Sequence, residues 1–579
     1  MTMSKGKVYL GICIALLSGM TSTALVQAQA TQPPSDRIIQ LEQQRQAEER
    51  RRIEAEQRNR SEYPVPFEER QSAESLDGPC FTIQQIELQG VNQLPLSEFD
   101  ETLTSFVGQC LGVGQLNEVL TAVTRRYFEL GYITTRAYLP QQNLQQGTLI
   151  IQVIEGLVEA IESAANRQAS ENLAIIFPGL EQQILNLRDL EQGLEQINRL
   201  RSRRATMQLI PGSAMGQSLV EIQEQTAQPW QITSRFSNSG QDNTGESQAQ
   251  LMASWDSPLG LYDYTYLSLQ TDTKDDSDGK KSQSVSWHWD IPLGYWNLSL
   301  DTTYFEYLSR VQGTNQTFET SGKSQTQRLS IGRVLSRDAD SKTRLNLGLT
   351  RKENENFIED VLIETSSRTL GIATLALKHE QYFQRGGLLL GELTYHRGLD
   401  AFSSPDDDEI NSQLRHLAPK AQFDKYTIDI DFNQPFSLAA FSNKLQYKTR
   451  LHAQYSPDVL FGSEEISIGS AYTVRGYKES SLSSNTGAYW RNDLLASFYP
   501  AWGKDWLQRV TPFIGLDAGL VRDYSTDTDK YETLKGWAVG LMATGKYWSI
   551  EMTYAQPIDE PDYLRNTGEE FAFSISFTL

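Results

Sequence analysis

Phe571-Ala572-Phe573-Ser574-Ile575-Ser576-Phe577-Thr578-Leu579 places an apolar side chain at every second position. A period of two puts all the apolar side chains on one face of a β-strand and the small or polar ones on the other. Such a strand is apolar on one side only. The same pattern recurs through a large part of the chain, so this stretch predicts the fold of much more than its own nine residues.

The alternation extends from Trp230 to Leu579, with polar, turn-rich segments such as Thr273–Lys281 and Ser403–Glu409 between the strands. A soluble β-sandwich would also alternate. The apolar parity is unusually rich in aromatic residues, which is typical of the girdles of membrane β-barrels, and about 22 residues per strand with its loop predict roughly 16 strands. Members of the repeating parity include Leu251, Ala253, Trp255, Tyr262, Tyr264, Tyr266, Val285, Trp287, Trp289, Ile291, Leu345, Leu347, Leu349, Ile428, Ile430, Phe432, Trp548, Ile550, Met552 and Tyr554.

Two smaller α+β modules precede the alternating region. In residues 81–156, a strand-like start at Phe81–Leu88 leads to an amphipathic helix over Leu116–Leu130 and a closing strand at Leu149–Gly156. Residues 157–226 repeat the pattern more loosely, with a helical stretch at Leu187–Leu200. We expect the modules to bind extended peptide at a sheet edge, with a rigid spacer as the alternative.

The N-terminal 80 residues are predicted to fall into three parts. Residues 1–30 have a basic start, a short apolar run and Ala28-Gln29-Ala30, which predicts a cleaved signal peptide. Residues 31–60 contain strong helix formers with charges all round and no apolar stripe, so the helix is either solvated or in a polar channel. Residues 61–80 include three prolines and are expected to form a linker.

Composition excludes several function classes. The net charge of −21 argues against nucleic acid as a partner. The five histidines have no metal-ligand spacing, and no nucleophile motif or phosphate-binding glycine loop is present, so we expect no catalytic site, metal or cofactor. Beyond Cys13 in the signal segment, Cys80 and Cys110 remain, an even number in an oxidising compartment, which favours a disulfide over two buried thiols.

One arginine and one aspartate stand out within the alternating region. Val474-Arg475-Gly476-Tyr477 has the character of a tight loop, and Gly515, Asp517 and Gly519 lie at alternate positions of a strand-like run. A charge inside a barrel lumen must be paired or in contact with water. We therefore expect Arg475 and Asp517 to form an ion pair; a surface arginine in a turn is the alternative.

The residues Val474–Tyr477, followed by Gly487-Ala488-Tyr489-Trp490-Arg491-Asn492, resemble the loop of two-partner secretion transporters, the TpsB proteins of the ShlB/FhaC/HecB type. In that family the arginine lies on a long extracellular loop folded into the lumen and pairs with the aspartate of a motif that Gly515, Asp517 and Gly519 match. Gly131–Arg136 and Val153–Gly156 are similar to POTRA-domain signatures.

The resemblance implies periplasmic POTRA domains at 81–156 and 157–226, followed by a transmembrane antiparallel β-barrel at 227–579. It also implies that residues 31–60 form a plug helix, for which a frayed tail is the alternative. The implied function is export of an unfolded TpsA-type exoprotein, either a haemolysin, an adhesin or a contact-dependent toxin, across a Gram-negative outer membrane. Implied partners are outer-membrane lipid and lipopolysaccharide, and periplasmic chaperones and barrel-assembly machinery during biogenesis. A barrel-assembly protein and a passive porin are the alternatives.

Overall fold

The computed structural model describes residues 34–61, 79–165, 167–273, 279–312, 316–364, 366–407, 418–438, 444–503, 506–523, 530–564 and 568–579. The expected signal peptide and most of the expected linker lie outside these residues. Within the described ranges, no helix is both long enough and apolar enough to cross a membrane.

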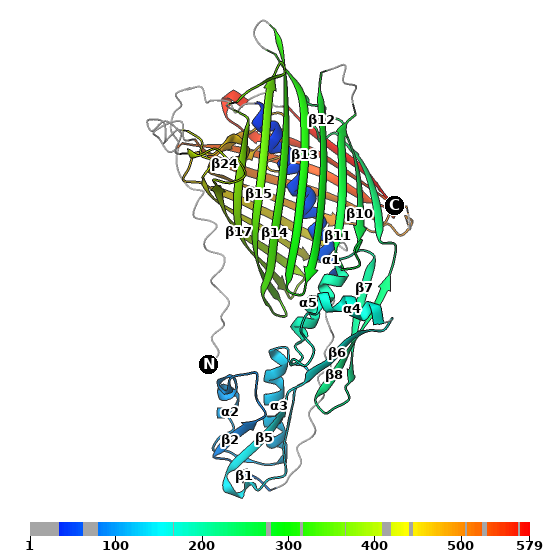
Figure 1. Cartoon of the computed structure of the whole chain (residues 1–579), viewed down its shortest axis with the longest axis vertical. Coiled ribbons are helices and arrows are strands. Elements are labelled where there is room, and N and C mark those ends of the chain that lie inside the picture. The colour runs from blue at the N-terminus through cyan, green and yellow to red at the C-terminus, as the bar shows by residue number, and fades with distance from the viewer. Residues whose placement is uncertain are drawn as a thin grey trace.

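A closed antiparallel β-barrel forms the larger part of the molecule (Figure 1). The predicted number of strands is confirmed, because 16 strands close the barrel. They are β9 (Trp230–Ser237), β10 (Gln248–Asp256), β11 (Tyr264–Asp272), β12 (Lys281–Leu293), β13 (Trp296–Gln312), β14 (Thr317–Arg337), β15 (Ser341–Ile358), β17 (Arg368–Phe383), β18 (Gly387–Leu399), β19 (Asp424–Phe436), β20 (Lys444–Tyr455), β23 (Gly487–Ser497), β24 (Arg509–Asp523), β25 (Lys530–Thr544), β26 (Trp548–Asp559) and β27 (Glu570–Thr578). The two-residue β16 (Val361–Leu362) only extends the tip of β15.

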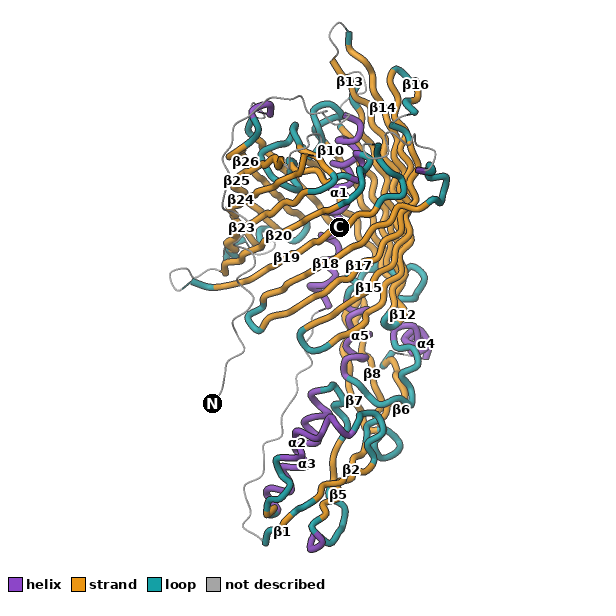
Figure 2. Tube along the Cα trace, turned by 90° about the vertical axis from the view of Figure 1, so that its left-hand side faces the viewer, coloured by secondary structure: helices purple, strands orange, loops and turns teal. Residues whose placement is uncertain are grey.

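The barrel wall is uneven in height. Strands β13 to β15 are the longest, whereas β9 to β11 have eight or nine residues each. The tall strands rise on one side of the barrel in Figure 2. The barrel closes where β27 pairs with β9, from Ser574 opposite Ser237 to Thr578 opposite Thr233.

Most of the alternating apolar side chains face outward, as lipid contact requires. Leu251, Trp255 and Phe577 are among these exposed residues. Tyr395, Tyr426 and Tyr455 occupy paired positions on three neighbouring strands with ring centroids 5.2 and 6.4 Å apart, a cross-strand row of the kind found in aromatic girdles.

Tyr262, Tyr264 and Tyr266 are an exception to the predicted outward parity. All three are buried. The lipid-facing positions of β11 are instead those of Leu267 and Leu269. The tyrosines belong to a cluster shared with the second module, so the parity assigned to them from sequence was wrong. The Tyr262 hydroxyl gains a hydrogen bond to Glu224 there, and the Tyr266 ring stacks on His288.

The first module packs a helix on a three-stranded sheet. Its elements are β1 (Phe81–Thr82), β2 (Gln85–Gln89), η1 (Leu96–Phe99), α2 (Asp100–Thr104), β3 (Cys110–Leu111), α3 (Val113–Glu129), β4 (Arg136–Tyr138), η2 (Leu144–Gln146) and β5 (Thr148–Ile154), with sheet order β2-β5-β4. Helix α3 buries Leu116, Val119, Val123 and Tyr127. Burial of each such side chain contributes about 1.5–3 kcal/mol to folding. The strand expected at Phe81–Leu88 is broken, because β1 pairs with β3 and β2 with β5.

The second module has the same kind of architecture, with β6 (Leu157–Ser163), α4 (Arg167–Ile176), α5 (Leu187–Asn198), β7 (Arg203–Pro211) and β8 (Gln217–Thr226). Its sheet order is β6-β8-β7. Helix α4 was not anticipated from the sequence. The second module lies directly below the barrel, and the first lies farther from it (Figures 1 and 2).

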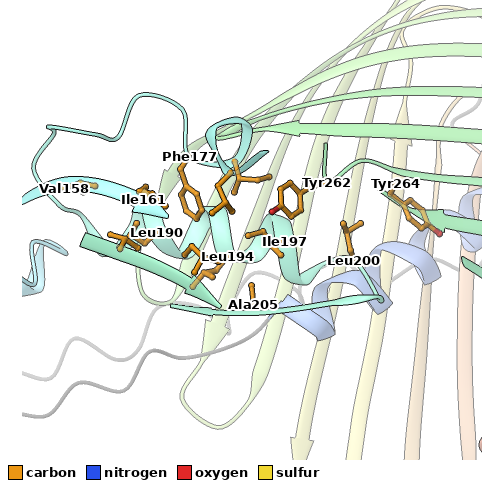
Figure 3. Packing of buried hydrophobic residues seen from close by; sticks show 14 of the residues in the cluster. Val158, Ile161, Phe177, Leu190, Leu194, Ile197, Leu200, Ala205, Tyr262 and Tyr264 are labelled. Carbon is orange, nitrogen blue, oxygen red and sulfur yellow. The ribbon is translucent and has the colours of Figure 1, made fainter. Parts of the chain in front are cut away.

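The junction between the second module and the barrel is a continuous core. Side chains of α5, including Leu190, Leu194 and Ile197, belong to one buried cluster with Tyr262 and Tyr264 of the barrel (Figure 3). The Tyr262 hydroxyl donates to Glu224 Oε1 at 2.6 Å, and Arg199 forms an ion pair with Asp290 at 2.6 Å. Burial and the hydrogen bond to Glu224 raise the pKa of the Tyr262 phenol above its ordinary value. The module and the barrel are therefore joined by apolar packing and by buried polar contacts.

Candidate functional site: a hairpin and a helix in the barrel lumen

The segment 456–486, between β20 and β23, forms a small hairpin inside the barrel. Its strands are β21 (Ile466–Ile468) and β22 (Leu482–Ser484), and the Val474–Tyr477 motif lies in the connection between them. The hairpin has a core of its own, to which the barrel strands contribute three residues. The members of this core are Ile466, Ile468, Val474, Tyr477, Leu482, Tyr489, Val521 and Leu534.

Arg475 and Asp517 are held together at close range. Arg475 donates from Nε to Asp517 Oδ2 at 2.6 Å and from Nη2 to Asp517 Oδ1 at 2.7 Å, and its backbone N–H donates to Oδ2 at 3.1 Å. Nη2 also donates to Asp493 Oδ1 at 2.7 Å. Arg475 is 3% exposed and Asp517 4%. Fork-like pairing of this kind fixes orientation as well as charge, which a lysine could not do.

Two glycines of β24 make room for the loop. A side chain at Gly515 would place its Cβ 2.2 Å from Arg475 Nη2, and one at Gly519 would lie 2.8 Å from Val474 Cγ2. Both distances are too short for contact between unbonded atoms. The Gly515, Asp517 and Gly519 pattern therefore has a structural reason, because the aspartate binds the arginine and the glycines admit the loop.

The remaining motif residues are also fixed to the barrel. Gly476 has a φ of +96°, which favours glycine, and its N–H donates to Glu570 Oε2 at 2.8 Å. The Tyr477 hydroxyl donates to the backbone carbonyls of Lys535, at 2.7 Å, and Asp559, at 2.9 Å. The motif thus touches β24 through β27.

A second group of charges binds the hairpin at its base, and the sequence analysis missed it. The Glu464 side chain pairs with Lys352 of β15 and with Lys425 of β19, whose Nζ is 2.8 Å from Oε2. These residues are distant in sequence and lack a common motif, so no spacing could have joined them. Asp493 and Glu570 were missed for the same reason.

Helix α1 (Pro34–Ser61) runs through the lumen (Figure 1). Ion pairs link it to the wall along its length. These are Asp36–Arg368 at 3.4 Å, Glu48–Arg450 at 2.7 Å, Glu49–Arg235 at 3.0 Å, Arg51–Asp429 at 2.8 Å, Glu54–Lys378 at 3.7 Å and Arg58–Glu380 at 3.6 Å. Such contacts explain why a helix charged all round can lie in a polar channel.

A cavity of about 550 Å³ lies beside α1. Its lining includes Glu49 of α1, Arg235 of β9, Arg450 of β20 and Arg475 of the hairpin. The cavity also has apolar lining residues, among them Leu388 and Phe432, so its surface is mixed and carries several charges. Polar contacts and ion pairs therefore hold most of the helix, and its beginning also packs Ile38 and Ile39 against Phe305 and Tyr307.

Cys80 and Cys110 form a disulfide in the first module, with Cα atoms 5.3 Å apart. It joins the start of the module to β3, next to the β1–β3 pair. Among the described residues, no group of three or more histidine, cysteine, aspartate or glutamate side chains is arranged to hold a metal ion.

Comparison with known proteins gives matches along nearly the whole chain. The model of the family "Haemolysin secretion/activation protein ShlB/FhaC/HecB" matches residues 216–543, that of "POTRA domain, ShlB-type" matches residues 81–156, and that of "POTRA domain" matches residues 157–211.

Individual relatives give the same result. The chain is 33% identical to the outer membrane transporter CdiB of Escherichia coli, over 95% of this chain and 90% of the relative. It is 31% identical to the hemolysin transporter protein ShlB of Serratia marcescens, over 76% of each. The solved structure of CdiB from Escherichia coli matches with a TM-score of 0.84, at 31% identity, covering 95% of this chain and 100% of that one. The chain therefore belongs to the haemolysin secretion/activation family ShlB/FhaC/HecB, the outer-membrane transporters of two-partner secretion with periplasmic POTRA domains.

Proposed function

We propose that this chain exports one large partner protein, in unfolded form, across the outer membrane. The observation that supports the proposal is the lumen arrangement, in which helix α1 and an anchored hairpin lie inside the barrel. Relatives are named as transporters of hemolysin and as CdiB. The partner of this chain is a TpsA-type exoprotein, either a haemolysin, an adhesin or a contact-dependent toxin. Folding of the exported segments outside the cell would prevent them from sliding back.

Each part of the site has a proposed role. Helix α1 is the plug. Its more exposed ion pairs, such as Glu54–Lys378, suit that role because exposed pairs contribute only about 0–1 kcal/mol each and can be exchanged. Arg475 and Asp517 hold the hairpin in the position that export requires. The Cys80–Cys110 disulfide stabilises the first POTRA domain. Lipid and lipopolysaccharide contact the barrel exterior, and periplasmic chaperones and barrel-assembly machinery act during biogenesis.

Partner recognition is assigned to the POTRA domains. A pore that passes every segment of a long chain cannot bind each one tightly, whereas a sheet edge can hold one extended segment by backbone hydrogen bonds. Strand β7 is the best edge for this, because it has nine residues and, among the described residues, pairs only with β8. Leu209 and Ile210 on β7 are exposed. By contrast, β4, at an edge of the first sheet, has three residues.

The test is secretion of the co-produced partner by transporters altered at β7. Leu209→Lys together with Ile210→Lys should reduce secretion, because lysines on an edge strand oppose strand addition. Leu96→Lys changes a more exposed apolar residue, in the first POTRA domain, and serves as the control. Equal secretion by both variants, at equal amounts of folded barrel, would remove β7 as the recognition edge. Solute flux without any partner secretion, even in the unaltered chain, would favour a porin.

A further inference from the structure

Glu464 carries the ion pairs that join the base of the lumen hairpin to β15 and β19. It lies in the single turn η5 (Gly462–Glu464), which belongs to no sheet of the barrel. Its carboxylate pairs with Lys352 and Lys425, and its backbone carbonyl accepts hydrogen bonds from Lys425 Nζ at 3.2 Å and Gln454 Nε2 at 3.0 Å. The Glu464 side chain is 5% exposed. Three barrel strands thus converge on one short turn.

The same turn receives the beginning of α1. The Gln40 side chain donates to the carbonyl of Gly462 and, at 3.4 Å, to that of Glu465. A Cβ at Gly462 would lie 2.3 Å from Asp36 Oδ2, so α1 and the turn are in close contact. Arg368 joins the two elements, because it pairs with Asp36 and lies over the Phe461 ring at 4.3 Å.

Farther along, α1 continues to bind the hairpin. Gln44 Nε2 donates to the Ser467 carbonyl at 3.0 Å, Gln44 Oε1 accepts from the Ser470 hydroxyl at 2.8 Å, and Arg37 Nη2 donates to the Lys478 carbonyl at 3.1 Å. Side chains of the N-terminal half of α1 therefore donate hydrogen bonds to backbone carbonyls of the hairpin. These carbonyl groups can accept hydrogen bonds from α1 only while the turn that carries them keeps its position.

We propose that Glu464 is a positioning residue for export, which fixes η5 to β15 and β19 and thereby holds the hairpin where α1 binds. Arg475 fixes the tip of the hairpin to β24, and Glu464 fixes the base to different strands. Removing the carboxylate charge leaves two buried ammonium groups without their partner, so the turn would move away from the lysines. The inference rests on the proposed plug role of α1.

The first test measures whether the turn is held. A Ser463→Cys variant of the purified, folded chain without residues 1–30, and so without Cys13, carries one free thiol, because Cys80 and Cys110 are bonded to each other. Residue 463 is buried, so the thiol should be protected from labelling. Adding Glu464→Gln should raise the rate of maleimide labelling at least roughly tenfold, since breaking a buried ion pair is strongly destabilising. Glu464→Asp keeps the charge and should restore most of the protection. Lys420→Gln, which removes the exposed partner of Asp458 in the same hairpin, should leave the rate unchanged.

Substitution of the two lysines of the barrel wall that pair with Glu464 keeps the test valid if Glu464→Gln does not fold. Lys352→Gln and Lys425→Gln should each raise labelling, and adding either one to Glu464→Gln should raise it less than the sum of the single effects. Unchanged labelling in the glutamine variants of Glu464, Lys352 and Lys425 would overturn the proposal, whatever the role of α1.

The second test measures conductance in planar bilayers. Glu464→Gln should raise single-channel conductance in the full chain and have little further effect once residues 34–61 are deleted. Unaltered conductance after the deletion itself would contradict the plug role alone, and the labelling result would then decide on Glu464. A rise caused by the deletion but not by Glu464→Gln would overturn the link from Glu464 to α1 while leaving the plug.

Discussion

At the scale of single residues, the site depends on close approach between a guanidinium group and the backbone of β24. Arg475 uses its Nε, its Nη2 and its own backbone N–H on one carboxylate and shares Nη2 with Asp493. Such an arrangement needs the planar fork of arginine on one side and the absence of a side chain at Gly515 on the other. We therefore propose that the charged pair and the glycine beside it are the residues that matter for export.

Arg475→Ala should impair export more than barrel folding. Leaving Asp517 unpaired costs up to about 3–5 kcal/mol for a buried pair, and water in the lumen should reduce this. Arg475→Lys should recover only part of the export, because lysine cannot reproduce the two-atom contact. Heat-modifiable migration on a gel reports folding, and the amount of secreted partner reports export. Arg397→Ala breaks an exposed pair with Asp424 and is the control. Normal secretion by Arg475→Ala at normal abundance would refute the role of the pair.

Gly515→Ala should reproduce the export defect without removing a charge. Its methyl group would lie 2.2 Å from Arg475 Nη2, so the guanidinium must move away from Asp517 and Asp493. Gly391→Ala is the matched control in a barrel strand, because a Cβ there meets nothing within 4 Å. The same secretion assay applies to both. An export level equal to that of Gly391→Ala would show that the loop tolerates a side chain at this position.

At the scale of elements, α1 and the hairpin form one polar unit inside the barrel. The N-terminal half of α1 binds the hairpin, and ion pairs with the wall continue to Arg58. Most of these contacts are ionic or polar and lie beside a cavity, and a small apolar cluster joins Ile38 and Ile39 to Phe305 and Tyr307 of β13. An element of this kind is suited to a reversible role.

Deleting residues 34–61 should raise single-channel conductance while the barrel stays closed and folded. The reason is that α1 occupies the lumen and contributes no strand to the barrel. Raising the salt concentration should increase the frequency of large openings of the full chain, because salt screens ion pairs that are in contact with water. Planar-bilayer recording measures both effects. Equal conductance with and without residues 34–61 would mean that the segment does not obstruct the pore in the membrane.

At the scale of the whole molecule, the periplasmic and membrane parts are joined through the second POTRA domain. Its helix α5 shares a buried cluster with barrel tyrosines, and Lys342 of β15 contacts both Glu195 of α5 and Glu380. Glu380 in turn pairs with Arg58 at the far end of α1. Ion pairs therefore link the second POTRA domain to the barrel wall, and the wall to α1.

Exchanging residues 81–226 for those of a related transporter should change which partner is secreted, with the barrel kept. Tyr262 and Asp290 of the barrel contact the second POTRA domain, so the introduced domain must be able to make the same contacts. Loss of these contacts would reduce secretion of every partner. Secretion of both possible partners, measured side by side, separates altered choice from general loss. Partner choice that follows the barrel would show that recognition does not reside in the POTRA domains.

The sequence by itself determined the order and type of the parts. Period-two alternation specified one-sided strands, and helical periodicity specified α3. The all-round charge of α1 predicted polar surroundings for most of its length, although Ile38 and Ile39 pack in a small apolar cluster. The Arg475 and Asp517 motifs were visible because both lie in short, distinctive runs of sequence. Each of these features depends on neighbours in the chain, which a sequence records directly.

Only the tertiary structure decided which surfaces and charges meet. It turned Tyr264 and Tyr266 inward against the second POTRA domain, although their alternation is the same as that of lipid-facing residues. It also brought Glu464 to Lys352 and Lys425, which come from separate strands. The physical reason is that barrel closure and the inward fold of the hairpin create contacts between residues far apart in the chain, and no local pattern encodes which of these distant residues will be partners.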